Sequence, residues 1–171
     1  MFHAKTSASR FLVLTAAASI AAAGLARAET KGPSMTDQVI DEAFKALEST
    51  SDRLDKVKAA VTATADLVEA MEHALDVTKD IDFVKKHIDT AEKSQQNVKE
   101  EISSIDKQHA SVRAKLESVL KTLKKSDDKT TRANLKAAFG FLEFAERRSD
   151  GLGRNNFDLG DRIQTIADKI E

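Results

Sequence analysis

An unbroken heptad repeat runs through residues 77–123. Steps of four and three residues, starting at Val77, meet an apolar side chain at every position except Gln95 and His109. The stretch contains neither glycine nor proline, so nothing in it interrupts a helix. One helix cannot bury a continuous apolar stripe by itself, and a partner helix must therefore lie along it. The repeat predicts one arm of a coiled coil or of a long helical bundle.

A helix is also expected before the repeat, beginning at Ser34. Ser34 and Asp37 match a capping box, in which the side chain of each residue accepts a hydrogen bond from the backbone N–H of the other. Polar residues stand at Ser51, Lys58 and Glu72, where a strict two-stranded seam would be apolar. A wide, imperfect stripe suits a helix that contacts two neighbours. The apolar positions of this helix are Ile40, Phe44, Leu47, Leu54, Val57, Val61, Val68, Met71 and Leu75.

The apolar pattern slips by two residues between Val68 and Val77. A single helix could absorb the slip as a stutter, but a turn at residues 75–80 is the commoner solution, with Thr78 or Asp80 capping the next helix. Opposite charges in an antiparallel hairpin would also meet, and these weak pairs favour that arrangement. The expected pairs are Asp41 with Arg113, Asp55 with Lys99, and Glu69 with Lys85. They stand against one unfavourable pair, Glu48 with Asp106.

A third arm is expected after a polar turn at residues 126–128, which follows the cations Lys121, Lys124 and Lys125. Glycines in the segment 150–153 predict a break in this arm, after which Asn155 or Asn156 caps a last helix. The apolar residues before the break are Leu135, Ala138, Phe139, Leu142 and Ala145, and those after it are Leu159, Ile163, Ile166 and Ile170.

These elements predict an all-α fold over residues 34–171. The three arms are of similar length, and the expected architecture is an elongated up-down-up three-helix bundle or antiparallel coiled coil. Its third arm is expected to consist of two helices.

Residues 1–28 have the pattern of a cleaved secretory signal peptide. Lys5 and Arg10 precede an apolar run at 11–25, and Ala26-Arg27-Ala28 matches a cleavage signal. The apolar run is about 15 residues long, whereas a membrane-spanning helix needs roughly 20. We therefore expect removal of this segment, a short leader at 29–33, and export of the chain to a bacterial periplasm or out of the cell.

Composition narrows the function further. The chain has 27 basic and 28 acidic residues, and three basic residues lie in the signal peptide, which leaves a formal charge of about −4. Binding to a phosphate backbone needs clustered Lys and Arg, so nucleic acid is not an expected partner. The chain has no cysteine, which excludes thiolate catalysis, zinc–thiolate sites and iron–sulfur clusters. It also lacks a Gly-x-Ser-x-Gly motif, and we expect neither enzymatic activity nor a cofactor.

The two polar residues on the seam, Gln95 and His109, are expected to set the register of the helices. His109 follows Asp106 by three residues, a spacing close to the Glu-x-x-His step of di-iron bundles. A second copy of the motif is missing, so a metal carrier is the weakest hypothesis for this chain. Glu69 and His73 also share a helix face, which we interpret as a solvated surface.

Phenylalanine is concentrated near the end of the chain. The candidate docking residues for a partner or a lipid surface are Phe139, Phe141, Leu142, Phe144 and Phe157. On a helix, the side chains of residues 139–144 cover an arc too wide for a single contact. The cluster therefore either closes the end of the bundle core or forms a docking patch.

The function expected from these features is that of an exported, non-enzymatic helical bundle that acts through protein–protein contacts, as a scaffold, an adaptor or a holdase-like protein. The alternative is a protein that places amphipathic helices on a lipid surface, which the phenylalanine cluster favours and the acidic face of the first helix opposes. The heptad repeat also leaves open a homo-oligomer in which a second copy covers the seam. The sequence does not identify the protein partner.

Overall fold

The computed structural model describes residues 34–123 and 129–170, which belong to one compact unit. Three features predicted from the sequence lie outside these residues, namely the signal peptide, the leader and the polar turn at 126–128. Lys124 and Lys125, which precede that turn, also lie outside them. The described residues contain no strand. Their elements are α1 (Met35–His73), the short π-helical turn η1 (Ala74–Thr78), α2 (Ile81–Thr122) and α3 (Lys129–Ile170).

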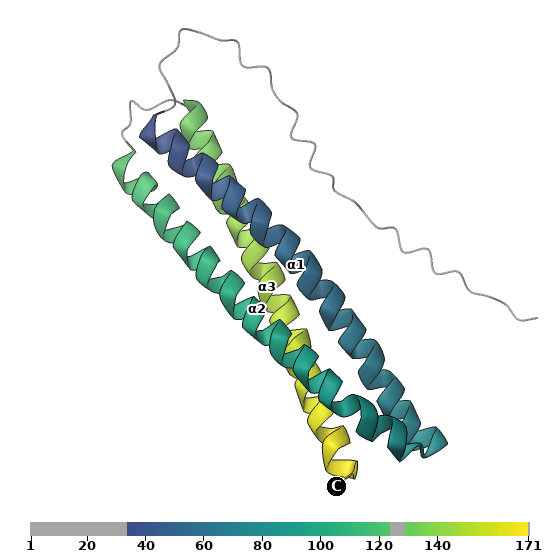
Figure 1. The fold of residues 1–171 in the computed structure, drawn as a ribbon. Coiled ribbons are helices and arrows are strands. Elements are labelled where there is room, and N and C mark those ends of the chain that lie inside the picture. Colours follow the sequence, from purple (N-terminus) through teal and green to yellow (C-terminus); the bar gives the residue numbers. More distant parts are fainter. Residues whose placement is uncertain (1–33, 124–128, 171) are drawn as a thin grey trace, which may run out of the picture. The chain divides into compact units, whose positions relative to one another are not determined.

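The three long helices pack side by side and alternate in direction (Figure 1). Thr50 contacts His109, whereas Thr64, further along α1, contacts Ser94, which comes earlier in α2. The contacts of α2 with α3 follow the same reversed order. α2 is therefore antiparallel to both of its neighbours, and the predicted all-α, up-down-up three-helix bundle is confirmed.

α1 begins at the predicted capping box. The Ser34 hydroxyl accepts a hydrogen bond of 3.2 Å from the Asp37 N–H, and the Asp37 carboxylate accepts one of 3.3 Å from the Ser34 N–H. The Asp37 carboxylate also accepts a bond of 2.8 Å from the hydroxyl of Thr131, at the start of α3. The Ser34 hydroxyl in turn donates to the Asp37 carboxylate at 2.7 Å, and this bond above all, together with those from Thr131 and the Ser34 N–H, holds the pKa of Asp37 below its usual value. The cap therefore also connects the first turns of α1 and α3.

The chain reverses between α1 and α2 where the register slip predicts a turn. Lys79 has a left-handed backbone (φ 57°), and the next N–H, that of Asp80, donates to the Ala74 carbonyl at 2.9 Å. Asp80 caps α2, because its carboxylate accepts a bond of 3.0 Å from the Phe83 N–H. Of the two predicted caps, Asp80 has this role, whereas the Thr78 hydroxyl donates back to the Ala74 carbonyl.

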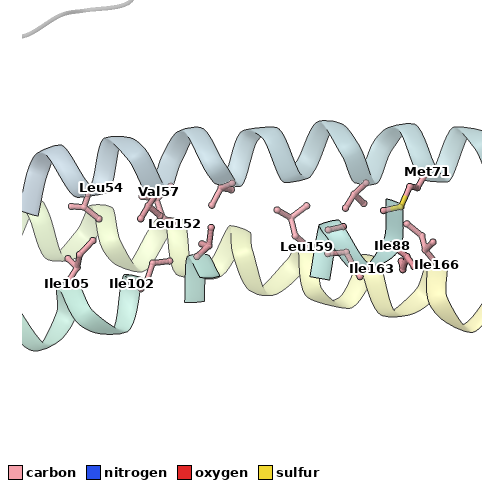
Figure 2. Packing of buried hydrophobic residues seen from close by; sticks show 14 of the residues in the cluster. Leu54, Val57, Met71, Ile88, Ile102, Ile105, Leu152, Leu159, Ile163 and Ile166 are labelled. Atoms are coloured by element: carbon pink, nitrogen blue, oxygen red, sulfur yellow. The ribbon is translucent and has the colours of Figure 1, made fainter. Parts of the chain in front are cut away.

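The apolar seam of α2 is buried between α1 and α3 from Val84 onward. Apolar side chains of α1 and α3 pack against it in a shared core (Figure 2). Its first two positions, Val77 and Ile81, lie at the turn and stay exposed. The core consists of two apolar clusters, which Thr50 separates along α1 and His109 separates along α2. Helices of the same chain thus cover the seam that the sequence left open to a second copy.

The prediction that the third arm breaks at residues 150–153 is wrong, because α3 is one continuous helix. None of its glycines has a positive φ, so each has an ordinary helical backbone. The four glycines inside it are Gly140, Gly151, Gly153 and Gly160.

Burial of the core face explains why α3 continues through these glycines. A helical glycine costs roughly 1 kcal/mol relative to alanine. The heptad spacing persists across the glycine-rich segment, however, and Ser149, Leu152 and Asn156 are all buried against the other helices. A break would expose these side chains, and their burial outweighs the low helix propensity of the segment. Asn156, a predicted helix cap, is therefore a core residue.

Gly151→Ala should raise the free energy of unfolding by about 1 kcal/mol. A Cβ atom at this position meets no atom within 4 Å, so the gain in helix propensity is unopposed. Urea denaturation followed by circular dichroism measures the change. At low protein concentration, where contacts between copies do not contribute, Gly140→Ala is the matched control, because its surroundings within the chain are equally open and its gain should be similar. A loss of stability for Gly151→Ala alone would indicate a break in α3.

Candidate functional site

Of the two polar seam residues, His109 is the more deeply buried, with 1% of its surface exposed. Its Nε2 atom lies 3.3 Å from the hydroxyl oxygen of Thr50 on α1. The Thr50 hydroxyl donates its own hydrogen to the Leu47 carbonyl at 2.9 Å. It therefore accepts the bond from His109, which places the ring proton on Nε2. Nδ1 has no hydrogen-bond partner among the residues that the structure describes.

Burial keeps this ring neutral. Desolvation of the charged form lowers the pKa of His109, and it outweighs the opposite effect of the Asp106 and Glu146 carboxylates. Protonation would also place an N–H at Nδ1, where the described part of the chain offers no acceptor. His109 thus acts as a neutral donor from α2 to α1, which fits the predicted role in setting the helix register.

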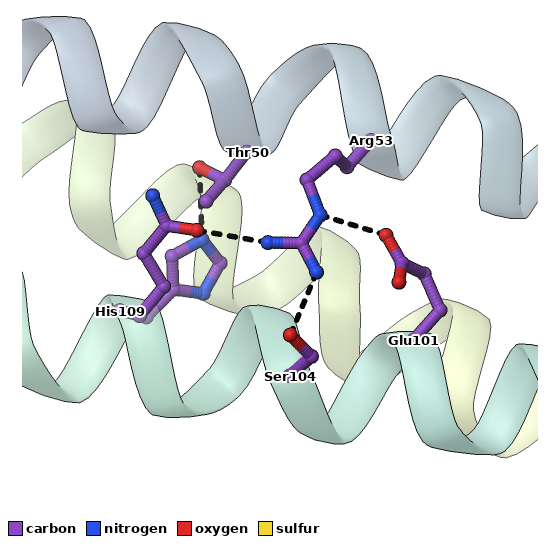
Figure 3. A network of polar contacts seen from close by, with 6 residues as sticks. Thr50, Arg53, Glu101, Ser104 and His109 are labelled. Atoms are coloured by element: carbon purple, nitrogen blue, oxygen red, sulfur yellow. Dashed lines mark hydrogen bonds and ion pairs between the residues drawn. The ribbon is translucent and has the colours of Figure 1, made fainter.

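Arg53 forms a larger polar network beside this pair (Figure 3). Its guanidinium extends from α1 and donates to Glu101 at 2.7 Å, to Ser104 at 2.8 Å and to Gln108 at 2.9 Å, all on α2. The bond from Arg53 lowers the pKa of Glu101. One side chain thus spans three acceptors on successive turns, and a shift of α1 along α2 by one heptad would break all three bonds.

Gln95 joins α2 to α3 through a reciprocal pair of hydrogen bonds. The Asn156 side-chain amide donates to the Gln95 backbone carbonyl at 3.1 Å, and the Gln95 side-chain amide donates to the Asn156 backbone carbonyl at 3.4 Å. Gly160 allows this close approach, since a Cβ atom there would lie only 2.9 Å from Nε2 of Gln95. The sequence indicated Gln95 as a register residue, but its partner was concealed by the predicted break.

The residues considered for metal binding do not converge. In residues 34–123 and 129–170, no group of three or more His, Asp or Glu side chains is close enough to hold an ion. The Asp106 carboxylate accepts a hydrogen bond of 2.7 Å from the Ser149 hydroxyl, whereas His109 faces Thr50. Asp106 and His109 therefore contact different helices.

The five candidate docking residues differ in burial. Leu142 is fully buried and belongs to one of the two core clusters. Phe139 is half-buried and packs against the same cluster. Both belong to the bundle itself. The other three side chains are largely exposed, at 48% for Phe141, 65% for Phe144 and 67% for Phe157.

The exposed rings also lie on two flanks of α3. Phe141 is on the α1 side, where it meets Phe44 edge to face with ring centroids 5.8 Å apart. Phe157 is on the α2 side, beside Ile102. The sequence grouped these rings into one patch, and the structure divides them into two surfaces.

A groove of about 420 Å³ lies on the α2 side of α3. Gly153 adds no side chain to it, and a Cβ atom there would meet nothing within 4 Å. Three carboxylates and one guanidinium accompany the exposed ring of Phe157. The lining residues are Ile102, Asp106, Ser149, Asp150, Gly153, Arg154, Phe157 and Asp158.

Most of this groove could not be found from the sequence, because its α2 and α3 residues are far apart in the chain. The spacing of Gly153 and Phe157 could have indicated part of the groove, since residues four apart share one side of a helix. The predicted break placed them on different elements and hid that relation.

No helix in the described part of the chain is both long and apolar enough to cross a membrane. No model of a protein family matches this sequence, and it matches neither a curated protein nor a solved structure. The candidate site is therefore defined by its own geometry.

His109→Leu should remove a pH dependence of stability. The pKa of His109 is lowered in the folded state, so as the pH falls the unfolded chain takes up a proton first. The stabilising contribution of the neutral ring is complete above about pH 6.5 and is lost as the pH falls from there through the folded pKa. Thermal unfolding of both proteins between about pH 7.5 and pH 5 measures this difference.

The variant should also be more stable than the natural protein at neutral pH, by about 1 kcal/mol, because no buried nitrogen remains unpaired. Replacement of an exposed histidine, His73→Gln, is the control and should leave the profile unchanged. If His109→Leu retained the loss of stability between about pH 6.5 and pH 5, another group would be responsible.

Proposed function

We propose that this chain is an exported, non-enzymatic helical bundle that binds another polypeptide in the groove between α2 and α3. The observation that carries the proposal is an exposed aromatic ring, Phe157, one helical turn from an open position, Gly153. Glycine weakens a helix, and an exposed phenyl ring contributes little to folding. Neither residue is required by the bundle, whereas both suit a site that receives a side chain from a partner.

The groove favours a partner that presents an apolar side chain next to Lys or Arg. The apolar side chain can pack on Phe157 and Ile102 above the open position at Gly153. Three carboxylates against one guanidinium give the lining a negative charge, which attracts a basic group on the partner. The site is thus suited to a basic, partly apolar segment of another polypeptide.

A lipid surface is the less favoured occupant. Anionic headgroups would be repelled by the carboxylates of the groove. A helix that lies on a membrane also needs one continuous apolar face, whereas Phe141 and Phe157 lie on opposite flanks of α3. Polypeptide binding is therefore the function that these contacts support best.

Replacement of Phe157 by the photoreactive analogue benzoyl-phenylalanine tests the proposal. Irradiation in cells of the source organism should give a discrete protein adduct, because the analogue keeps the aromatic ring at the groove. Mass spectrometry then distinguishes protein adducts from lipid adducts. Adducts to lipid alone, or no adduct at all, would contradict the proposed function.

A second substitution shows whether the adduct depends on the groove. Gly153→Leu fills the groove and should abolish the adduct. Gly151→Leu is the matched control, because it adds the same side chain outside the lining and should preserve the adduct. Both variants replace a helical glycine with open surroundings, so both should be at least as stable as the natural chain. An adduct that persists in Gly153→Leu would place the binding site elsewhere.

A further inference from the structure

α3 has a second stripe of small and apolar residues on its outward face. Ala133, Ala137, Gly140 and Phe144 follow one another at steps of four, three and four, and all four are exposed. A Cβ atom at Gly140 would meet nothing within 4 Å, so the bundle does not use the space above it. This spacing is the one that a helix uses to contact another helix along its length.

We propose that this stripe binds a second copy of the same chain, with the two α3 helices antiparallel across a two-fold axis between Phe139 and Gly140. This contact differs from the oligomer that the sequence suggested, because the seam of α2 is already covered within the chain. It also does not depend on a partner in the groove beside Phe157.

The sizes of the side chains are self-complementary about this axis. In an antiparallel pair, Phe144 of one copy lies over the gap between Ala133 and Ala137 of the other, where two small side chains leave room for a ring. Gly140 lies next to the axis and lets the two backbones approach closely. Phe141, which is 48% exposed, lies on one flank of the stripe. In the antiparallel pair it is within one helical turn of Phe141 of the second copy.

The charges on the other flank are self-complementary about the same axis. Lys129, Lys136, Glu143 and Asp150 are exposed and follow one another at steps of seven residues. Because like flanks face each other in an antiparallel pair of helices, Lys136 faces Glu143 of the second copy and Lys129 faces Asp150. In a parallel pair, each flank would instead face the opposite flank of the other copy, and these four charges would not meet one another. Glu143 is already 3.7 Å from Arg147, but that exposed pair is weak and can exchange.

The oligomeric state and its orientation are both measurable. Sedimentation of the purified protein should show a dimer. Lys136→Glu should raise the dimer dissociation constant at least about tenfold, and Lys136→Glu combined with Glu143→Lys should restore it. Lys136 is exposed, and circular dichroism should show each variant as helical as the natural chain. A monomer at about 100 μM, or a dimer that Lys136→Glu leaves unchanged, would overturn the proposal.

The absence of cysteine permits a clean test of the geometry. Gly140→Cys places one thiol near the axis and should oxidise to a disulfide-linked dimer. Ala133→Cys is the matched control on the same stripe, because its two copies are about 20 Å apart along an antiparallel pair and should not link. Rapid linkage of both variants would indicate a parallel pair and would exclude the proposed axis.

Discussion

Burial of the apolar seam of α2 is the constraint on which the other contacts of this bundle depend. From Val84 onward the seam faces α1 on one side and α3 on the other, and removal of either helix would expose it to water. Each large aliphatic side chain on it contributes roughly 1.5–3 kcal/mol when fully buried. Long helices of this kind gain most of their stability from such packing rather than from their own backbone bonds.

Apolar packing alone does not select one alignment of the three helices, because a heptad repeat fits itself again after a shift of seven residues. Polar contacts supply the selection. Thr50 meets His109 between the two core clusters, Arg53 reaches three residues of α2, and Gln95 exchanges hydrogen bonds with Asn156. On the third interface, Glu72 of α1 binds the Arg162 guanidinium through two hydrogen bonds. A shift of any helix would leave buried polar groups without partners, which is costly.

The charge pairs expected from the sequence show how far pairwise reasoning extends. It correctly favoured an antiparallel hairpin, yet Asp55 pairs with Arg148 of α3 and Arg113 pairs with Glu146 of α3. The expected pairs assumed two helices in isolation. In a three-helix bundle, the flank of α1 that carries Asp55 faces α3. Its partner therefore comes from the third helix, which was not included when only the first two helices were paired.

The sequence by itself determined the three helical arms, the capping box at Ser34 and the turn capped by Asp80, because these depend on residues within one or two turns of each other. Only the tertiary structure decided that α3 continues through its glycines, that Asn156 is a core residue, and that Phe157 borders a groove. Local propensity disfavours a helix at residues 150–153 by roughly 1 kcal/mol for each glycine. Burial of Leu152 and its neighbours against α1 and α2 reverses that preference, and it depends on residues far away in the chain.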